Sequence, residues 1–201
     1  MKKLKILVPF LIAVSVLMSG CNKTDSNNNS AGTAENSSVA DNLESTGDSA
    51  EYDKLVESFK PLVDSYYNSI MNKDYDEFSS VFPEFYLKAL ENESGIGKDG
   101  YTGKDFMQNN YDWYVNQYGS DFDYAYEFGD IARIMPDSIE ECKASIKQYL
   151  DADVDIEEAY AVNVQEKVTG SKLETPVYNE IPWLILKIDG KYWLYETYYE
   201  K

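Results

Sequence analysis

The chain has 201 residues, a formal net charge of −18 at pH 7 and no histidine. Such a surface repels phosphate, which disfavours nucleic acid and anionic lipid as partners. Without an imidazole, no Ser/His/Asp or Cys/His catalytic group can form, and only two cysteines are present to bind zinc. We therefore predict no catalytic residues of these types, no metal site and no cofactor. Carboxylates and tyrosines remain as plentiful acid and base groups.

The N-terminus has the three parts of a secretory signal peptide. Three lysines among the first five residues precede an apolar run over residues 6–18, and Ser19 and Gly20 follow. This run is too short to cross a bilayer core of ~30 Å as a helix. Residues 17–21 (LMSGC) resemble the lipobox of bacterial lipoproteins, which implies cleavage between Gly20 and Cys21 and lipidation of Cys21. We therefore expect a protein that is lipid-anchored at the cell membrane and faces outside the cytoplasm.

The composition changes near residue 50. Residues 22–50 contain no aromatic residue and are rich in Asn, Ser, Thr, Ala, Asp and Glu, which is typical of a disordered segment. All 18 tyrosines and all three tryptophans lie after this segment. The sequence thus predicts a signal peptide over residues 1–20, a lipidated cysteine and tether over 21–50, and one acidic domain over 51–201.

The first half of this domain is expected to form two helical segments. Apolar residues recur at intervals of three and four over residues 52–70, where Asp48 and Glu51 are placed to cap the start. Pro61 is expected to kink or restart this helix. A second pattern covers residues 75–90. Asp74 is its expected cap, and Pro83 should bend or divide it.

Two further helices are predicted. One covers residues 104–118 and ends at Gly119, with Trp113 among its inward-facing residues. The other follows Asp137 as its cap and places Ile139, Cys142, Ile146, Tyr149 and Leu150 on one face. Cys142 is interpreted as a buried apolar residue, because a lipidated Cys21 would leave it without a disulfide partner.

Alternation of apolar and polar residues predicts strands over 122–128, 160–168, 181–188 and 191–199. Asp189 and Gly190 form a strong signal for a two-residue hairpin turn. That turn would pair Ile188 with Lys191, Leu186 with Trp193 and Leu184 with Tyr195 on one face, and Ile185 with Leu194, Trp183 with Glu196 and Ile181 with Tyr198 on the other. Both faces are largely apolar, so we expect helices, another protomer or a ligand to cover them.

These elements predict an α+β fold in which N-terminal helices pack on a curved antiparallel sheet of about four strands. Their order, residues 66–78 (YYNSIMNKDYDEF) and residues 188–193 (IDGKYW) resemble the nuclear transport factor two-like, or cystatin-like cone, superfamily. The resemblance implies a sheet curved around a long helix, with a cone that holds a small molecule or is filled by side chains. It also implies dimerisation through the sheet in many members, and Asp/His or Asp/Tyr groups in the enzymes.

Two motifs match ligand sites only in part. Residues 95–100 fit the spacing G-x-G-x-x-G, but they follow a predicted helix rather than a strand, which favours a flexible loop. Asp151, Asp153 and Asp155 resemble the start of a calcium loop, although Ile156 and Val162 occupy the positions that require Gly and Glu. A solvated acidic turn is the favoured interpretation, with weak binding of extracellular calcium as the alternative.

The leading functional hypothesis is a non-enzymatic lipoprotein whose domain binds an envelope protein, a second copy of itself or a small apolar ligand. Candidate ligand or interface residues are the aromatic ones near the C-terminus: Trp183, Tyr192, Trp193, Tyr195 and Tyr198. Such residues more often belong to a core. The alternative hypothesis is a small cone-type enzyme, an isomerase, dehydratase or cyclase, that uses Asp and Tyr. A role in cell-envelope immunity or signalling is a third hypothesis, which the sequence does not separate from the first.

Overall fold

The computed structural model describes residues 43–45, 49–93 and 102–197 of the chain. This part has an α+β fold, as predicted. The helices are α1 (Ser49–Asn72), α2 (Tyr75–Ser80), α3 (Glu84–Glu93), α4 (Gly103–Tyr118) and α5 (Pro136–Leu150). The strands are β1 (Leu43–Ser45), β2 (Asp123–Ile134), β3 (Ile156–Thr169), β4 (Val177–Ile188) and β5 (Lys191–Thr197).

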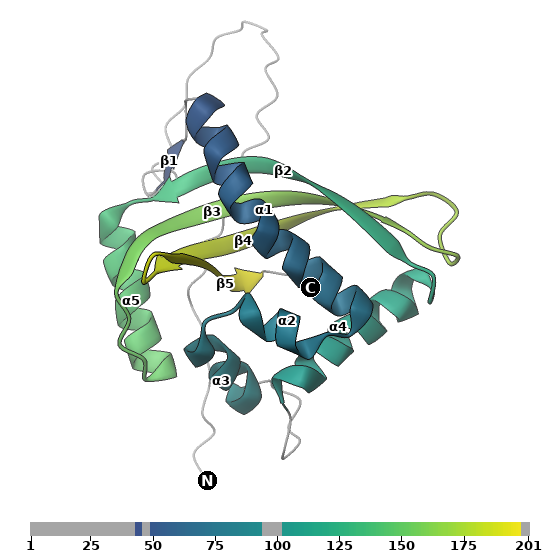
Figure 1. Ribbon diagram of the computed structural model, residues 1–201, viewed down its shortest axis with the longest axis horizontal. Helices are drawn as coiled ribbons and strands as arrows, with labels where there is room; N and C mark the ends of the chain where they lie inside the picture. Colours follow the sequence, from purple (N-terminus) through teal and green to yellow (C-terminus); the bar gives the residue numbers. More distant parts are fainter. Residues whose placement is uncertain (1–42, 46–48, 94–101, 198–201) are drawn as a thin grey trace, which may run out of the picture.

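Four main strands and the short β1 form one curved sheet (Figure 1). The order across the sheet is β1-β2-β3-β4-β5, and every neighbouring pair is antiparallel. β1 and α1 begin inside the range that the sequence assigns to the tether. The signal peptide, Gly20, Cys21, residues 95–100 and Tyr198 lie outside the described residues.

The prolines and caps act on the helices largely as local chemistry predicts. Pro61 lies inside the continuous helix α1, so it does not restart the helix. The side chain of Asp74 accepts a hydrogen bond from the backbone N–H of Glu77 at the start of α2. Pro83 lies between α2 and α3, which confirms that it divides the second pattern. Gly119 ends α4 with φ 108°, a conformation that favours glycine.

Three expectations about α4 and α5 are wrong. The N-cap of α5 is Met135 rather than Asp137, because Pro136 occupies the first helical turn, where its fixed φ is favourable. Trp113 and Tyr149 are each 45 % exposed. Both lie at the margins of helix faces whose centres are filled by Tyr114 and Ile146, so periodicity alone placed them too far inward.

The predicted hairpin turn forms, and its register holds from the Ile188–Lys191 pair to the Ile185–Leu194 pair. The register then shifts, so that Leu184 pairs with Glu196 and Trp183 with Thr197. The expected Leu184–Tyr195 and Trp183–Glu196 pairs are therefore wrong. The irregularity adds one residue to β5, as a β-bulge does, and turn chemistry does not encode it.

Helices of the same chain cover both faces of this hairpin. Ile185 and Leu194 belong to the cluster that α1 buries, together with Phe59, Val63 and Ile70, all with exposures of 0 %. Leu186 lies on the other face and packs with residues of α5, including Cys142 and Ile146. α1 lies across one face of the sheet while α5 covers one end of the other (Figure 1). Of the three expected covers, helices are the one that the structure shows.

Candidate functional site

The aromatic residues proposed for ligand or partner binding do not share one surface. Trp183 is 2 % exposed and meets the ring of Tyr66 edge-on, with 4.8 Å between ring centroids. Its indole Nε1 has no hydrogen-bond partner within the described structure. Tyr192 lies on the same side of the sheet, where its ring contacts that of Phe59. These contacts place Trp183 in the core and Tyr192 at its margin.

Trp193 and Tyr195 pack elsewhere. The ammonium of Lys191 lies 3.5 Å from the ring centroid of Trp193, so a cation already covers this ring. Tyr195 packs against Phe85 and Tyr86 of α3. Part of each ring is therefore already covered by a neighbouring side chain of the same chain.

Tyrosine hydroxyls donate hydrogen bonds to carboxylates at three places in the described structure. These pairs are Tyr114 with Glu166 (2.8 Å), Tyr126 with Asp64 (2.5 Å) and Tyr160 with Glu158 (2.7 Å). They are the groups that a cone-type enzyme using carboxylate and tyrosine would need. Their neighbours, and the direction of the pKa shifts where one is resolved, bear on what these groups can do.

The richest polar group, here called the Arg133 cluster, consists of Arg133, Glu158, Tyr160, Lys187 and Tyr192. The guanidinium Nη2 of Arg133 lies 3.2 Å from the Tyr160 hydroxyl and 3.3 Å from the Glu158 carboxylate. The Lys187 ammonium approaches the same carboxylate at 3.7 Å. Arg133 is the only arginine of the chain. Its planar group can bond and stack at once, which a lysine cannot do.

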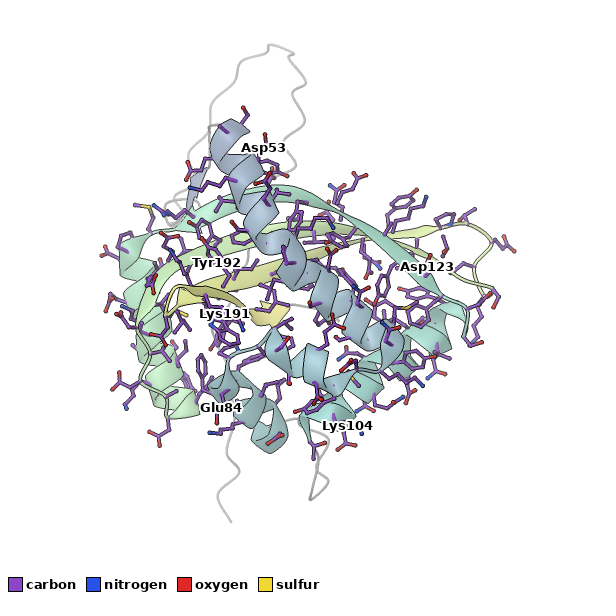
Figure 2. All side chains as sticks on the ribbon, viewed as in Figure 1. Asp53, Glu84, Lys104, Asp123, Lys191 and Tyr192 are labelled. Atoms are coloured by element: carbon purple, nitrogen blue, oxygen red, sulfur yellow. The ribbon has the colours of Figure 1, made fainter. Side chains whose placement is uncertain are left out.

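Strand register assembles this cluster from four strands. Arg133 of β2 pairs with Tyr160 of β3, while Glu158 pairs with Lys187 of β4, which in turn pairs with Tyr192 of β5. Because side chains alternate along each strand, these residues all project from the face that α1 covers. Figure 2 shows Tyr192 beside α1, far from Asp123 at the other end of the sheet.

The surroundings of the Arg133 cluster fix its charges. The hydrogen bond from Tyr160, followed by the charges of Lys187 and Arg133, lowers the pKa of Glu158. Burial and the hydrogen bond to Glu158 raise the pKa of Tyr160 to about 12. The hydrogen bond with Tyr160 and the charge of Glu158 raise the pKa of Arg133. The pKa of Glu158 and the pKa of Tyr160 are thus shifted in opposite directions, each farther from neutral pH.

The Tyr126 pair shows the same polarisation. Burial acts to raise the pKa of Asp64, but hydrogen bonds from Lys60 and Tyr126 outweigh it and lower that pKa. Burial and the hydrogen bond to Asp64 raise the pKa of Tyr126 well above its usual range. A general acid or base works best with a pKa near the operating pH, and these shifts move both partners away from it.

The Tyr114 pair is the most deeply buried of the three. Tyr114 and Glu166 are each 1 % exposed, and the amide of Asn179 donates a second hydrogen bond of 2.9 Å to Glu166. Two neutral donors thus satisfy both carboxylate oxygens inside the domain. This arrangement holds Glu166 in the packing of β3 against α4.

The sequence predictions named neither Arg133 nor Glu166, although each carried a signal. Arg133 stands out as the single arginine among 18 basic residues. Glu166 continues the alternating series Val162, Val164 and Val168, which places it on the buried face of β3. The partners of both residues come from distant parts of the chain, and sequence spacing does not reveal them.

The described residues contain no group of three or more acidic or cysteine side chains that could hold a metal ion. Two carboxylates of the calcium-like segment instead pair with lysines of α5, Asp153 with Lys147 and Asp155 with Lys143. No helix in the described part is both long and apolar enough to span a membrane. Comparisons with protein-family models, curated proteins and solved structures find no match to this chain.

Proposed function

We propose that the chain is a lipid-anchored binding protein of the cell envelope, not an enzyme. The anchor rests on the basic, apolar and small-residue segments that precede Cys21. Two or three acyl chains on that residue hold a protein stably at a membrane. The domain would then face the space outside the cytoplasm, where its charge keeps it soluble.

The geometry of the Tyr160–Glu158 pair is the observation that supports a non-catalytic role. The Tyr160 side chain is 2 % exposed, and its hydroxyl already donates to Glu158 at 2.7 Å and accepts from Arg133 at 3.2 Å. The carboxylate is stabilised as an anion and the phenol as a neutral donor. Arg133 and Glu158 keep 44 % and 29 % of their side-chain surface exposed, so these two charged groups are the part of the cluster that a partner could contact. The second polarised pair, Tyr126 with Asp64, adds to this support.

A protein partner has more support than a small apolar ligand. The apolar faces of the β4–β5 hairpin are buried by α1 and α5. Aromatic rings also fill the space between α1 and the sheet, among them Phe59, Tyr66 and Trp183. The groups left for recognition are largely polar and lie at the surface and margins of the sheet.

We also propose that the domain belongs to the cone superfamily. The long helix across a curved antiparallel sheet supports this proposal.

The anchor is tested by metabolic labelling with an alkyne fatty acid in a bacterial host. We expect the full chain to be labelled and Cys21→Ala to lose both the label and membrane retention. Cys142→Ala is the matched control, because this buried cysteine of α5 should not affect labelling. Equal labelling of Cys21→Ala and the unaltered chain would refute the anchor.

The binding role is tested by scanning a photo-crosslinking amino acid over exposed positions of the full chain in living cells. We expect one contiguous patch of positions to crosslink to one protein. Crosslinks scattered over all faces, or none at any position, would contradict the proposal.

A further inference from the structure

The strand β2 forms one margin of the sheet and is paired along only part of its outer side. β1 pairs with Ala132, Arg133 and Ile134 alone, although β2 is 12 residues long. Among the described residues, no strand lies beside residues 123–128 on that side. A strand edge presents a row of backbone donors and acceptors that can pair with another chain.

Two contacts show which backbone groups face outward. The N–H of Tyr124 points to the side chain of Asp123 at 2.9 Å, and the carbonyl oxygen of Phe128 accepts from the Tyr52 hydroxyl at 3.0 Å. In an antiparallel sheet, the N–H and C=O of one residue point to the same side of the strand, and this side alternates from each residue to the next. The N–H and C=O of Tyr126 and the N–H of Phe128 therefore face away from β3.

We propose that this edge, residues 123–128, binds an extended Lys- or Arg-rich segment of a partner protein by adding a strand to the sheet. The inference rests on the proposed binding function and names its surface. Main-chain hydrogen bonds would provide affinity, while side chains along the edge select the sequence. β1 already pairs with the other end of β2 in this manner, at residues 132–134.

Charge selects the class of partner. Asp123, Glu127 and Asp130 are exposed along or beside the open edge. Lys60, the cation that approaches Tyr126, is paired with Asp64 at 2.8 Å. A cationic segment would meet complementary charge over a stretch of roughly 20 Å. A second copy of β2 would bring like charges together, which disfavours self-pairing.

The test uses the full chain in detergent micelles and a decapeptide of alternating lysine and valine as the probe. Amide hydrogen exchange is followed by NMR. In the free protein, the Tyr126 and Phe128 amides should exchange faster than those of Ala125 and Glu127, which face β3. The lysine peptide should protect Tyr126 and Phe128, whereas an alternating glutamate and valine peptide should not.

A charge-reversed variant gives an independent measurement. Glu127→Lys combined with Asp130→Lys should weaken binding of the lysine peptide by roughly tenfold or more. Glu141→Lys combined with Glu84→Lys changes the net charge equally at exposed positions of α5 and α3, and it should bind nearly as the unaltered chain does. Equal weakening by both variants would show that only the overall charge attracts the peptide.

Three other results would overturn the inference. The first is slow exchange of the Tyr126 and Phe128 amides in the free protein. The second is protection of amides elsewhere by the peptide. The third is protection of this edge that rises with protein concentration alone, which would assign the edge to a second copy. If in-cell crosslinking still gives one patch on another surface, the binding function stands and only its assignment to β2 fails.

Discussion

The Tyr114 hydroxyl donates to Oε1 of Glu166 at 2.8 Å, deep between α4 and β3. The carboxylate is 1 % exposed, and Asn179 supplies its other hydrogen bond. The pair therefore joins a helix to the sheet through a polar contact inside an aromatic cluster. Its removal would leave a buried acceptor without its donor.

We expect Tyr114→Phe to lower the free energy of unfolding by about 1–3 kcal/mol, because the Glu166 oxygen would lose a hydrogen bond without gaining water. Urea denaturation measures the loss. Tyr178→Phe is the control, because the Tyr178 side chain is 72 % exposed and its change should leave stability nearly unaltered. Equal stability of both variants would mean that water reaches Glu166.

Glu158→Gln should make the free energy of unfolding less sensitive to pH in the acid range. The folded-state pKa of Glu158 lies below its ordinary value of 4.5. The contribution of Glu158 to the free energy of unfolding is therefore fully present above pH 4.5, and it is lost as the pH falls through the lower pKa of the folded state. The variant should be less stable than the unaltered chain at pH 7, and the difference should shrink in acid. Urea midpoints at several pH values measure this, and a constant difference would contradict it.

Gly190→Ala should destabilise the domain although a Cβ there would meet no atom within 4 Å. The cause is backbone strain, because Gly190 has φ 73° and an L-residue in the left-handed region costs roughly 1 kcal/mol or more. Asp189→Asn is the control, since asparagine tolerates the left-handed conformation that Asp189 adopts at φ 52°. Thermal unfolding separates the two, and unchanged stability of Gly190→Ala would show that the turn can relax.

Ile185→Ala and Leu186→Ala should each lower the free energy of unfolding by about 2–5 kcal/mol, because both side chains are fully buried. Their covers, α1 and α5, belong to the same chain, so each loss should be independent of protein concentration. Leu184→Ala, at a half-buried position, should cost less. A loss that grows on dilution would show that a partner subunit completes the core.

Local chemistry predicted much of the fold. The cap at Asp74, the division at Pro83 and the turn at Asp189 and Gly190 each depend on residues near one another in sequence, and each is found where expected. The bulge in β5 was not predictable, because it depends on how the strand meets its neighbours. Exposure of Trp113 was mispredicted because an aromatic residue at the margin of a helix face fits the same periodicity as one at its centre.

The Arg133 cluster could be predicted only in part. Once strands are assigned, alternation puts Glu158 and Tyr160 on one face, and the hairpin turn puts Lys187 opposite Tyr192. Alignment of β2 with β3 brings in Arg133, across a connection that contains all of α5. The register across so long a connection depends on tertiary packing, which a single sequence does not reveal.

The two margins of the sheet differ in a way that limits assembly. At β5, the N–H of Leu194 donates to the carbonyl oxygen of Val81 at 2.9 Å, and Lys191 reaches the carbonyl oxygen of Ser80 at 3.1 Å. The segment between α2 and α3 thus blocks that margin, whereas no strand of the described residues pairs with residues 123–128 on the outer side of β2. A fibre grows only when a newly added strand leaves another equivalent edge exposed. With the β5 margin closed, pairing of β2 between two copies of this chain would use up both open edges, so such assembly would end at a pair.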